Sequence, residues 1–176
     1  DPDREIELLA HEIDHAVRKL RGWMRGHRLG SSLTVFGTTS RLVPEPRGVA
    51  LILAPWNYPF HLALNPLTSA IAAGCCVILK PSEKTPATEA VLREIVAATF
   101  PQEEVAIVEG GPDVAAALLD QPFDHIHFTG GTEVFNSMWK TVGADMSRYR
   151  SYPRIVGETG GKDFIVAHGS ADPQAF

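Results

Sequence analysis

The chain has 176 residues, 44% apolar and 21% charged, so it is long enough to form one globular domain with a hydrophobic core. Its formal net charge of −5 offers no basic field for nucleic acid, and no apolar stretch reaches the roughly 18 to 20 residues of a membrane-spanning helix. Cys75 and Cys76 are its two cysteines, and because sequence neighbours rarely satisfy disulfide geometry, we expect free thiols and a cytoplasmic protein.

The first 47 residues are expected to form a helix followed by a hairpin. Apolar residues recur there at spacings of three and four, as on one stripe of an amphipathic helix: Ile6, Leu9, Ile13, Val17, Leu20 and Met24. Gly26 and Gly30 should end this helix, and residues 31–43, with Gly37 among Thr, Val and Leu, favour a short hairpin. The chain begins at Asp1 without a signal peptide, and we expect a truncated N-terminus.

From residue 48 onward, short apolar runs alternate with helical patterns. The expected strands are residues 49–54, 76–79, 105–108, 125–128, 155–156 and 164–167. The expected helices are residues 62–73, a helix capped by Thr85 with Pro86 at its first position, and two helices after Pro112 and Thr132. This alternation predicts an α/β fold with a doubly wound parallel sheet, whose ligand lies beyond the carboxyl ends of the strands.

Beyond the first strand, Asn57 stands between Pro55 and Pro59, whose rings restrict the local backbone. An amide held in this way can donate to an oxyanion that develops on a carbonyl carbon, and one such donor typically lowers a barrier by roughly 3 to 4 kcal/mol. The alternative is that Asn57 only closes a turn.

The second strand runs into Lys80 and Glu83, a cation and an anion three residues apart. Together they can bind a ribose diol, because Lys donates to hydroxyls and Glu accepts from them. A carboxylate at this place also repels a 2′-phosphate and favours NAD over NADP. The alternative is a surface ion pair of little energetic value.

The fourth strand runs into Thr129, Gly130 and Gly131, immediately before a helix. Glycines here let a pyrophosphate approach the backbone, and the helix N-terminus supplies unpaired N–H groups and a partial positive charge. The spacing is not G-x-G-x-x-G, so a plain strand-to-helix turn fits equally well.

The fifth strand leads into Glu158, which is followed by Gly160 and Gly161. A carboxylate in a partly buried cleft has a raised pKa and can activate water as a general base. The alternative is a solvated carboxylate at a strand end. Because all four polar groups follow strand carboxyl ends, we expect them along one rim of a single sheet.

Four motifs occur together in one order: Pro55-Trp56-Asn57, Lys80-Pro81-Ser82-Glu83, Phe128-Thr129-Gly130 and Glu158-x-Gly160-Gly161-Lys162. On these motifs the chain resembles the aldehyde dehydrogenase superfamily over nearly its whole length. The resemblance implies that residues 48–176 are its Rossmann-like dinucleotide-binding domain, incomplete at the C-terminal end, with NAD as cofactor, NADP possible, and no metal.

The resemblance also implies a role for each matching residue. Asn57 would be the oxyanion donor and Glu158 the general base. The residues that would bind the cofactor are Trp56, Lys80, Glu83, Gly111, Phe128, Gly130 and Gly131, with Lys80 and Glu83 on the adenosine ribose and Gly111 near the adenine.

The chain resembles two different subfamilies along its length. Up to about residue 130 it resembles the fatty and aromatic aldehyde dehydrogenases, for example in Leu20-Arg21-Gly22-Trp23-Met24. After that it resembles the pyrroline-carboxylate dehydrogenases, as in Tyr152-Pro153-Arg154-Ile155-Val156-Gly157-Glu158. Either this is an unusual branch or two sources have been joined.

The chain departs from the superfamily at two places. Gly131 stands where the superfamily commonly has Ser, so one hydroxyl contact to phosphate would be absent. The catalytic cysteine of the superfamily follows the Glu-x-Gly-Gly motif, whereas Cys75 and Cys76 precede it and are interpreted as buried structural thiols. We therefore expect a fragment without the nucleophile, most of the catalytic domain and the oligomerisation strand.

The resemblance implies that the intact parent is a homo-oligomer that oxidises a small-molecule aldehyde or semialdehyde to a carboxylic acid through a cysteine thioester. This chain alone would be inactive. One alternative is a catalytically inactive module that binds a nucleotide or a partner. Another is that a sheet cut short exposes an apolar edge and fails to fold.

Overall fold

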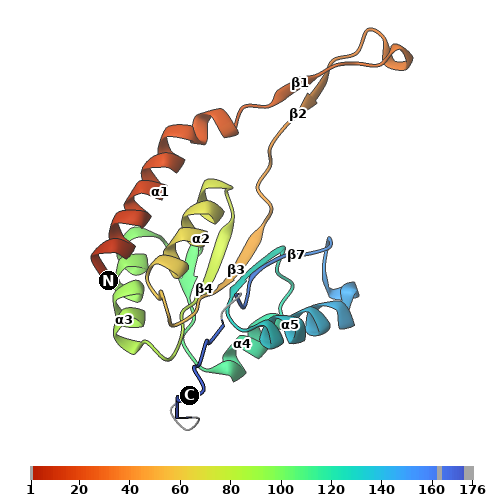
Figure 1. The fold of residues 1–176 in the computed structure, drawn as a ribbon. Helices are drawn as coiled ribbons and strands as arrows, with labels where there is room; N and C mark the ends of the chain where they lie inside the picture. Colours follow the sequence, from red (N-terminus) through yellow and green to blue (C-terminus); the bar gives the residue numbers. More distant parts are fainter. Residues whose placement is uncertain (1, 162–163, 173–176) are drawn as a thin grey trace.

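The computed structural model describes residues 2–161 and 164–172 (Figure 1). Its helices are α1 (Pro2–Trp23), α2 (His61–Ala72), α3 (Pro86–Thr99), α4 (Pro112–Leu119) and α5 (Thr132–Ala144), with short 3-10 turns η1 (Leu33–Val35) and η2 (Met146–Arg148). Its strands are β1 (His27–Leu29), β2 (Ser40–Leu42), β3 (Val49–Leu53), β4 (Cys76–Lys80), β5 (Val105–Ile107), β6 (His125–Thr129) and β7 (Arg154–Glu158).

Five strands form one parallel sheet in the order β5-β4-β3-β6-β7. The chain moves outward from β3 to β5 and then returns to place β6 on the other side of β3. The predicted doubly wound α/β fold is confirmed, and the reversal between β3 and β6 is the point at which such sheets bind ligands.

The continuous apolar run of β3 is explained by helices on both faces of the sheet. Ala50 and Ile52 pack into a cluster with side chains of α1, α2 and α3, while Leu51 and Leu53 pack with side chains of α4 and α5. All four are at most 6% exposed. The central strand is therefore buried from both sides, as expected for a parallel sheet.

Helix α1 forms where predicted, but most of its apolar stripe is not covered. Leu9 is 6% exposed and belongs to the core, whereas Ile13, Val17 and Met24 are 41% to 70% exposed. Figure 1 shows the reason: only the first part of α1 lies over the body of the molecule, and the rest runs past it toward the hairpin.

Glu5 fastens the covered end of α1 to α2. Its buried carboxylate accepts hydrogen bonds from the backbone N–H groups of Phe60 (3.2 Å) and His61 (2.9 Å), at the start of α2. These are unpaired helix N-terminal groups that a carboxylate stabilises. The division of the chain into an N-terminal segment, residues 1–47, and a dinucleotide-binding domain, residues 48–176, stays a prediction.

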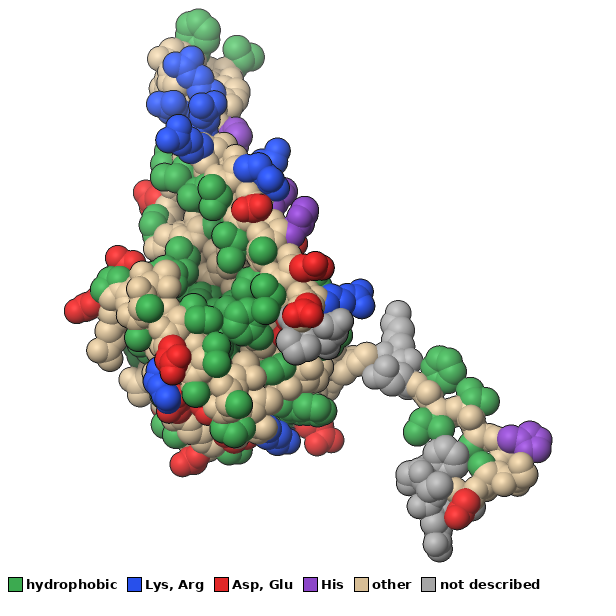
Figure 2. Space-filling view, turned by 90° about the vertical axis from the view of Figure 1, so that its left-hand side faces the viewer, with side chains coloured by type: hydrophobic (Ala, Val, Ile, Leu, Met, Phe, Trp, Pro, Cys, Tyr) green, Lys and Arg blue, Asp and Glu red, His purple; other side chains and the backbone are tan. Residues whose placement is uncertain are grey.

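The predicted hairpin is present but starts earlier than residue 31. Strands β1 and β2 pair antiparallel, with His27 opposite Leu42, and residues 30–39 form the connection with η1. The hairpin projects from the body as an arm, and Figure 2 shows Lys and Arg side chains gathered on it. Exposed Arg28 and Arg41 belong to this group.

The predicted strand at residues 164–167 is wrong. The described residues Phe164, Ile165 and Val166 are 75% to 84% exposed and have no regular structure. An apolar run becomes a strand only when its backbone pairs with a neighbour, and the sheet of the described residues ends at β7. None of the helices within the described ranges is long and apolar enough to cross a membrane.

The two-sided core makes a first prediction about stability. Leu79→Ala removes a fully buried side chain of β4 and should lower the free energy of unfolding by about 2 to 5 kcal/mol, measured by urea denaturation. Leu33→Ala is the matched control, because Leu33 is 91% exposed and its loss should change little. Equal losses in the two variants would contradict this account of the core.

Candidate functional site

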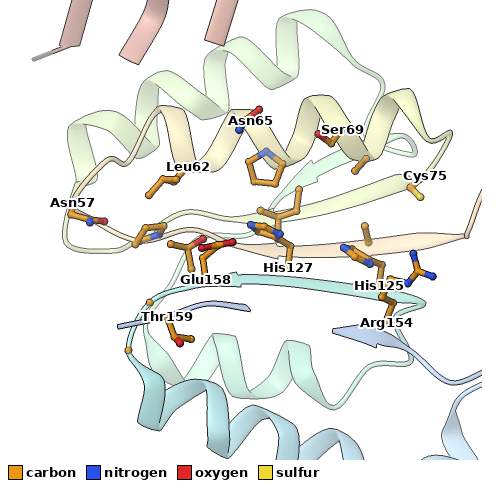
Figure 3. A pocket seen from close by; sticks show the side chains of 18 of the residues that line it. Asn57, Leu62, Asn65, Ser69, Cys75, His125, His127, Arg154, Glu158 and Thr159 are labelled. Atoms are coloured by element: carbon orange, nitrogen blue, oxygen red, sulfur yellow. The ribbon is translucent and has the colours of Figure 1, made fainter. Parts of the chain in front are cut away.

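A groove of about 980 Å³ runs along the sheet face between α2 and strands β6 and β7 (Figure 3). The floor of the groove is formed by alternate side chains of β6. Ile126 and Phe128 point into the core beside α4 and α5, so His125, His127 and Thr129 face the groove. Helix α2 provides the opposite wall.

Strand register brings the expected rim together. Leu53 at the end of β3 is paired with both Lys80 of β4 and Phe128 of β6, and Thr129 is paired with Glu158 of β7. The residues that follow these strand ends therefore meet at one edge of the sheet.

The groove takes in some of the expected site residues and not others. Those that line it are Trp56, Asn57, Gly130, Gly131 and Glu158. Those that do not line it are Lys80, Glu83, Gly111 and Phe128. Lys162 of the glycine motif lies outside the described residues.

Asn57 and Glu158 occupy the carboxyl end of the groove, and both are exposed. Asn57 makes no side-chain hydrogen bond with any described residue, so its amide is available to a ligand. Glu158 is exposed, so the partly buried setting that would favour a general base is not formed by the described residues. Burying Asn57 and Glu158 would require side chains that the described residues do not place over this end of the groove.

Lys80 and Glu83 form more than a surface ion pair. The Lys80 side chain is 6% exposed, and its Nζ donates to the Pro81 carbonyl (3.0 Å) and to Oε2 of Glu83 (3.4 Å). A backbone hydrogen bond, assisted by Lys80, lowers the pKa of Glu83. The ammonium is thus held in place at the end of β4 with its charge balanced by a carboxylate.

More carboxylates gather behind this pair, on α3 and after β5. Burial, and then the charge of Glu109, raise the pKa of Glu89, one of whose oxygens has no partner among the described residues. Glu109 itself pairs with Arg93. The surroundings of Lys80 are therefore rich in acidic groups.

The turn between β6 and α5 has the properties of an anion cradle. Gly131 is the N-cap residue of α5, and apart from its chain neighbours no described atom lies within 4 Å of the place where a Cβ would stand. The hydroxyl of Thr129 is buried and has no hydrogen-bond partner among the described residues. Gly130 lies against the ring of Phe128, which a Cβ would approach to 2.5 Å, so a larger residue here would displace that ring.

Phe128 and Gly111 have structural positions outside the groove. Phe128 is buried in the core and its ring stacks on Phe135 at 5.8 Å between centroids. Gly111 precedes the first residue of α4, Pro112, beyond the end of β5.

The prediction that both cysteines are buried is wrong. Cys75 is half-buried and Cys76 is exposed, and both are free thiols. Cys76 is the first residue of β4, at the amino end of the sheet, where the helix layers do not cover it. In Figure 3, Cys75 and Asn57 lie at opposite ends of the groove.

Several groove residues were not anticipated: Arg47, His125, His127 and Arg154. Burial lowers the pKa of both histidines. The signal was available in β6, where His125, His127 and Thr129 alternate with apolar residues, a pattern typical of a strand with one uncovered face.

The comparisons with known proteins agree with this geometry. The model of the aldehyde dehydrogenase family matches residues 3–176. The chain belongs to the aldehyde dehydrogenase family. A rat (Rattus norvegicus) aldehyde dehydrogenase family 3 member B1 is 41% identical over 97% of this chain, and the match covers 35% of that relative.

Solved structures share the fold. Staphylococcus aureus AldH superposes with a TM-score of 0.83 at 34% identity, over 89% of this chain and 33% of that one. Proline utilization A of Bradyrhizobium japonicum gives a TM-score of 0.73 at 31% identity, over 90% of this chain and 16% of that one. The chain thus spans about a third of the length of the curated relatives it matches.

The Lys80–Glu83 pair gives a prediction that needs no cofactor. Lys80→Met should raise the pKa of Glu83, measured by NMR titration of its carboxyl carbon. Because the folded pKa is lowered, this carboxylate stabilises the fold above its ordinary pKa and loses that effect as pH falls through the folded value. Lys84→Met is the control and should shift the Glu83 pKa less, since Lys84 exerts the weakest lowering effect. Equal shifts would show that Lys80 is not the partner.

Proposed function

We propose that this chain is the dinucleotide-binding part of an NAD-dependent aldehyde dehydrogenase, an oxidoreductase that converts an aldehyde to a carboxylic acid. The observation that carries the proposal is the grouping of Asn57, the Gly130–Gly131 turn and Glu158 at one end of one groove. Family members use NAD or NADP. The substrate, the activity of the whole protein and its assembly are proposed from the family.

The residues present fit a dinucleotide. The N-terminus of α5 offers backbone N–H groups to a pyrophosphate, Gly131 leaves room for it, and the Thr129 hydroxyl lacks a partner. Lys80, fixed by Pro81 and Glu83, can hold the adenosine ribose. Gly111 and Phe128 are proposed at the border of the nucleotide, and Trp56 at its nicotinamide end.

Asn57 and Glu158 would perform the chemistry that this chain contributes. The Asn57 amide donates a hydrogen bond to the substrate carbonyl oxygen as negative charge develops on it, which stabilises the transition state. Glu158 accepts a proton from the water that hydrolyses the thioester of the parent's cysteine. When bound, the nicotinamide ring supplies the hydride acceptor.

We propose NAD rather than NADP as the cofactor. Glu83 accepts from the ribose hydroxyls, and its charge opposes a 2′-phosphate. The carboxylates of Glu89 and Glu109 nearby add to the same negative potential. Three properties of the intact parent stay predictions. They are that it is a homo-oligomer, that it is cytoplasmic, and that it acts on a semialdehyde or a long-chain aldehyde.

Nucleotide binding can be tested by fluorescence of Trp56, which is 58% exposed, in a background that carries Trp23→Phe and Trp139→Phe. NAD should quench the signal, and Lys80→Ala and Glu83→Ala should each weaken binding about fivefold or more, the loss of a hydrogen bond to a charged group. Glu83→Gln should narrow the preference for NAD over NADP. Arg41→Gln on the hairpin is the control and should leave binding unchanged. Unaltered affinity in the Lys80 and Glu83 variants would refute the ribose assignment.

The alternative is a nucleotide-binding module without catalysis, and the position of the cysteines favours it for the chain by itself. Cys75 lies at the far end of the groove from Asn57, so neither cysteine is placed to attack a carbonyl held there. We expect no NADH absorbance when the purified chain is mixed with NAD and an aldehyde. NADH formation that disappears in a Cys75→Ser, Cys76→Ser variant would overturn this expectation.

A further inference from the structure

The amino end of the groove collects cationic side chains from three separate segments. Arg47 precedes β3, His125 begins β6 and Arg154 begins β7, and all three line the groove. His125 and Arg154 are register partners on neighbouring parallel strands, so their side chains stand side by side on one face. Figure 3 shows both at the end of the groove that holds Cys75.

Within residues 2–161 and 164–172, no carboxylate forms an ion pair with this group. Neither Arg47 nor Arg154 forms an ion pair with any residue that the structure describes. Asp124 precedes His125 in sequence, but its Oδ2 accepts the backbone N–H of Val49 (2.9 Å) and it does not line the groove. Glu45, two residues before Arg47, does not line the groove either. Glu158 lies at the other end of the floor, about 13 Å away for a strand of this length.

Like charges that face one cavity repel each other, and a bound anion removes that cost. The two guanidinium groups offer planar sets of N–H donors that match the oxygens of carboxylates and phosphates. A cleft whose lining has one sign of charge also concentrates oppositely charged solutes. On the α2 side the groove adds the uncharged polar side chains of Asn65 and Ser69.

We propose that Arg47, His125 and Arg154 form a binding site for a small oxyanion, a carboxylate or a phosphate, at the amino end of the groove. This site lies at the end of the sheet opposite the dinucleotide rim. It stands independently of the proposed function, because it uses none of the residues assigned to NAD or to aldehyde chemistry.

The protonation state of His125 reports on the site. Burial, and then the charges of His127, Arg154 and Arg47, lower the pKa of His125. The other groups that face it are the Cys75 thiol and, farther along β7, Glu158. An anion bound between the arginines must raise the pKa of His125, and by linkage its affinity must increase as pH falls.

The test is an NMR titration of the His125 ring in the full chain, with inorganic phosphate and with succinate in parallel samples. Sodium chloride at matched ionic strength separates binding from general screening. We expect phosphate, succinate or both to raise the His125 pKa beyond the effect of chloride, and the anion with the larger shift identifies the preferred group. Shifts no larger than those with chloride overturn the proposal.

Variants show whether the two arginines are responsible for the effect of the anion. Arg47→Gln combined with Arg154→Gln should raise the His125 pKa before any anion is added, and should weaken the anion affinity about threefold or more. Arg41→Gln on the hairpin removes the same charge elsewhere and should change neither. Because Arg47 and Arg154 are exposed, the amide spectrum of the double variant should match that of the original chain. If the anion shifted the His125 pKa of the double variant as much as that of the original chain, the proposed site would be wrong. A failure of the chain to bind NAD would leave this proposal unaffected.

Discussion

The pairing of β3 with β6 is the contact on which the rest of the site depends. It places the end of β3, and hence Asn57, beside the end of β6 and its glycine turn, although the two strands are more than seventy residues apart. The register is set by the alternation within β6: Ile126 and Phe128 are buried, and a slip of one residue would place His127 in the core instead. The hydrophobic effect on one face of β6 therefore determines which polar groups meet on the other.

Much of this arrangement could be predicted because it is encoded locally. Apolar runs bounded by Gly and Pro mark the strands, and Thr85 with Pro86 marks the start of a helix. Since carboxyl ends of parallel strands meet at one edge, the grouping of Asn57, Gly130 and Glu158 followed from the order of the elements alone. The Lys80–Glu83 pair was predicted as a pair, but not the burial of Lys80, which depends on side chains from other segments.

What could not be predicted depends on which surfaces are covered. Phe164, Ile165 and Val166 have the composition of a strand, yet no neighbouring backbone pairs with them. The stripe of α1 has the periodicity of a buried face, but only Leu9 reaches the core. His127 faces a groove rather than a packed helix because α2 packs on β3 and β4 and leaves this face of β6 uncovered. Composition and periodicity describe a segment, whereas coverage is a property of the assembled layers.

The open face of β6 and β7 gives the groove two electrostatically different ends. At the carboxyl end, Glu158 and Asn57 surround a position suited to an uncharged carbonyl, with the N-terminus of α5 beside it for phosphate oxygens. At the amino end, Arg47 and Arg154 attract negative charge, and His125 and His127 lie between, their pKa values lowered by burial. A carboxylate that enters the groove is repelled at Glu158 and attracted at the arginines, about 13 Å away. The floor of the sheet therefore holds a carboxylate and an amide at one end of the groove and two guanidinium groups at the other, and the strand order brings together the chain segments that carry them.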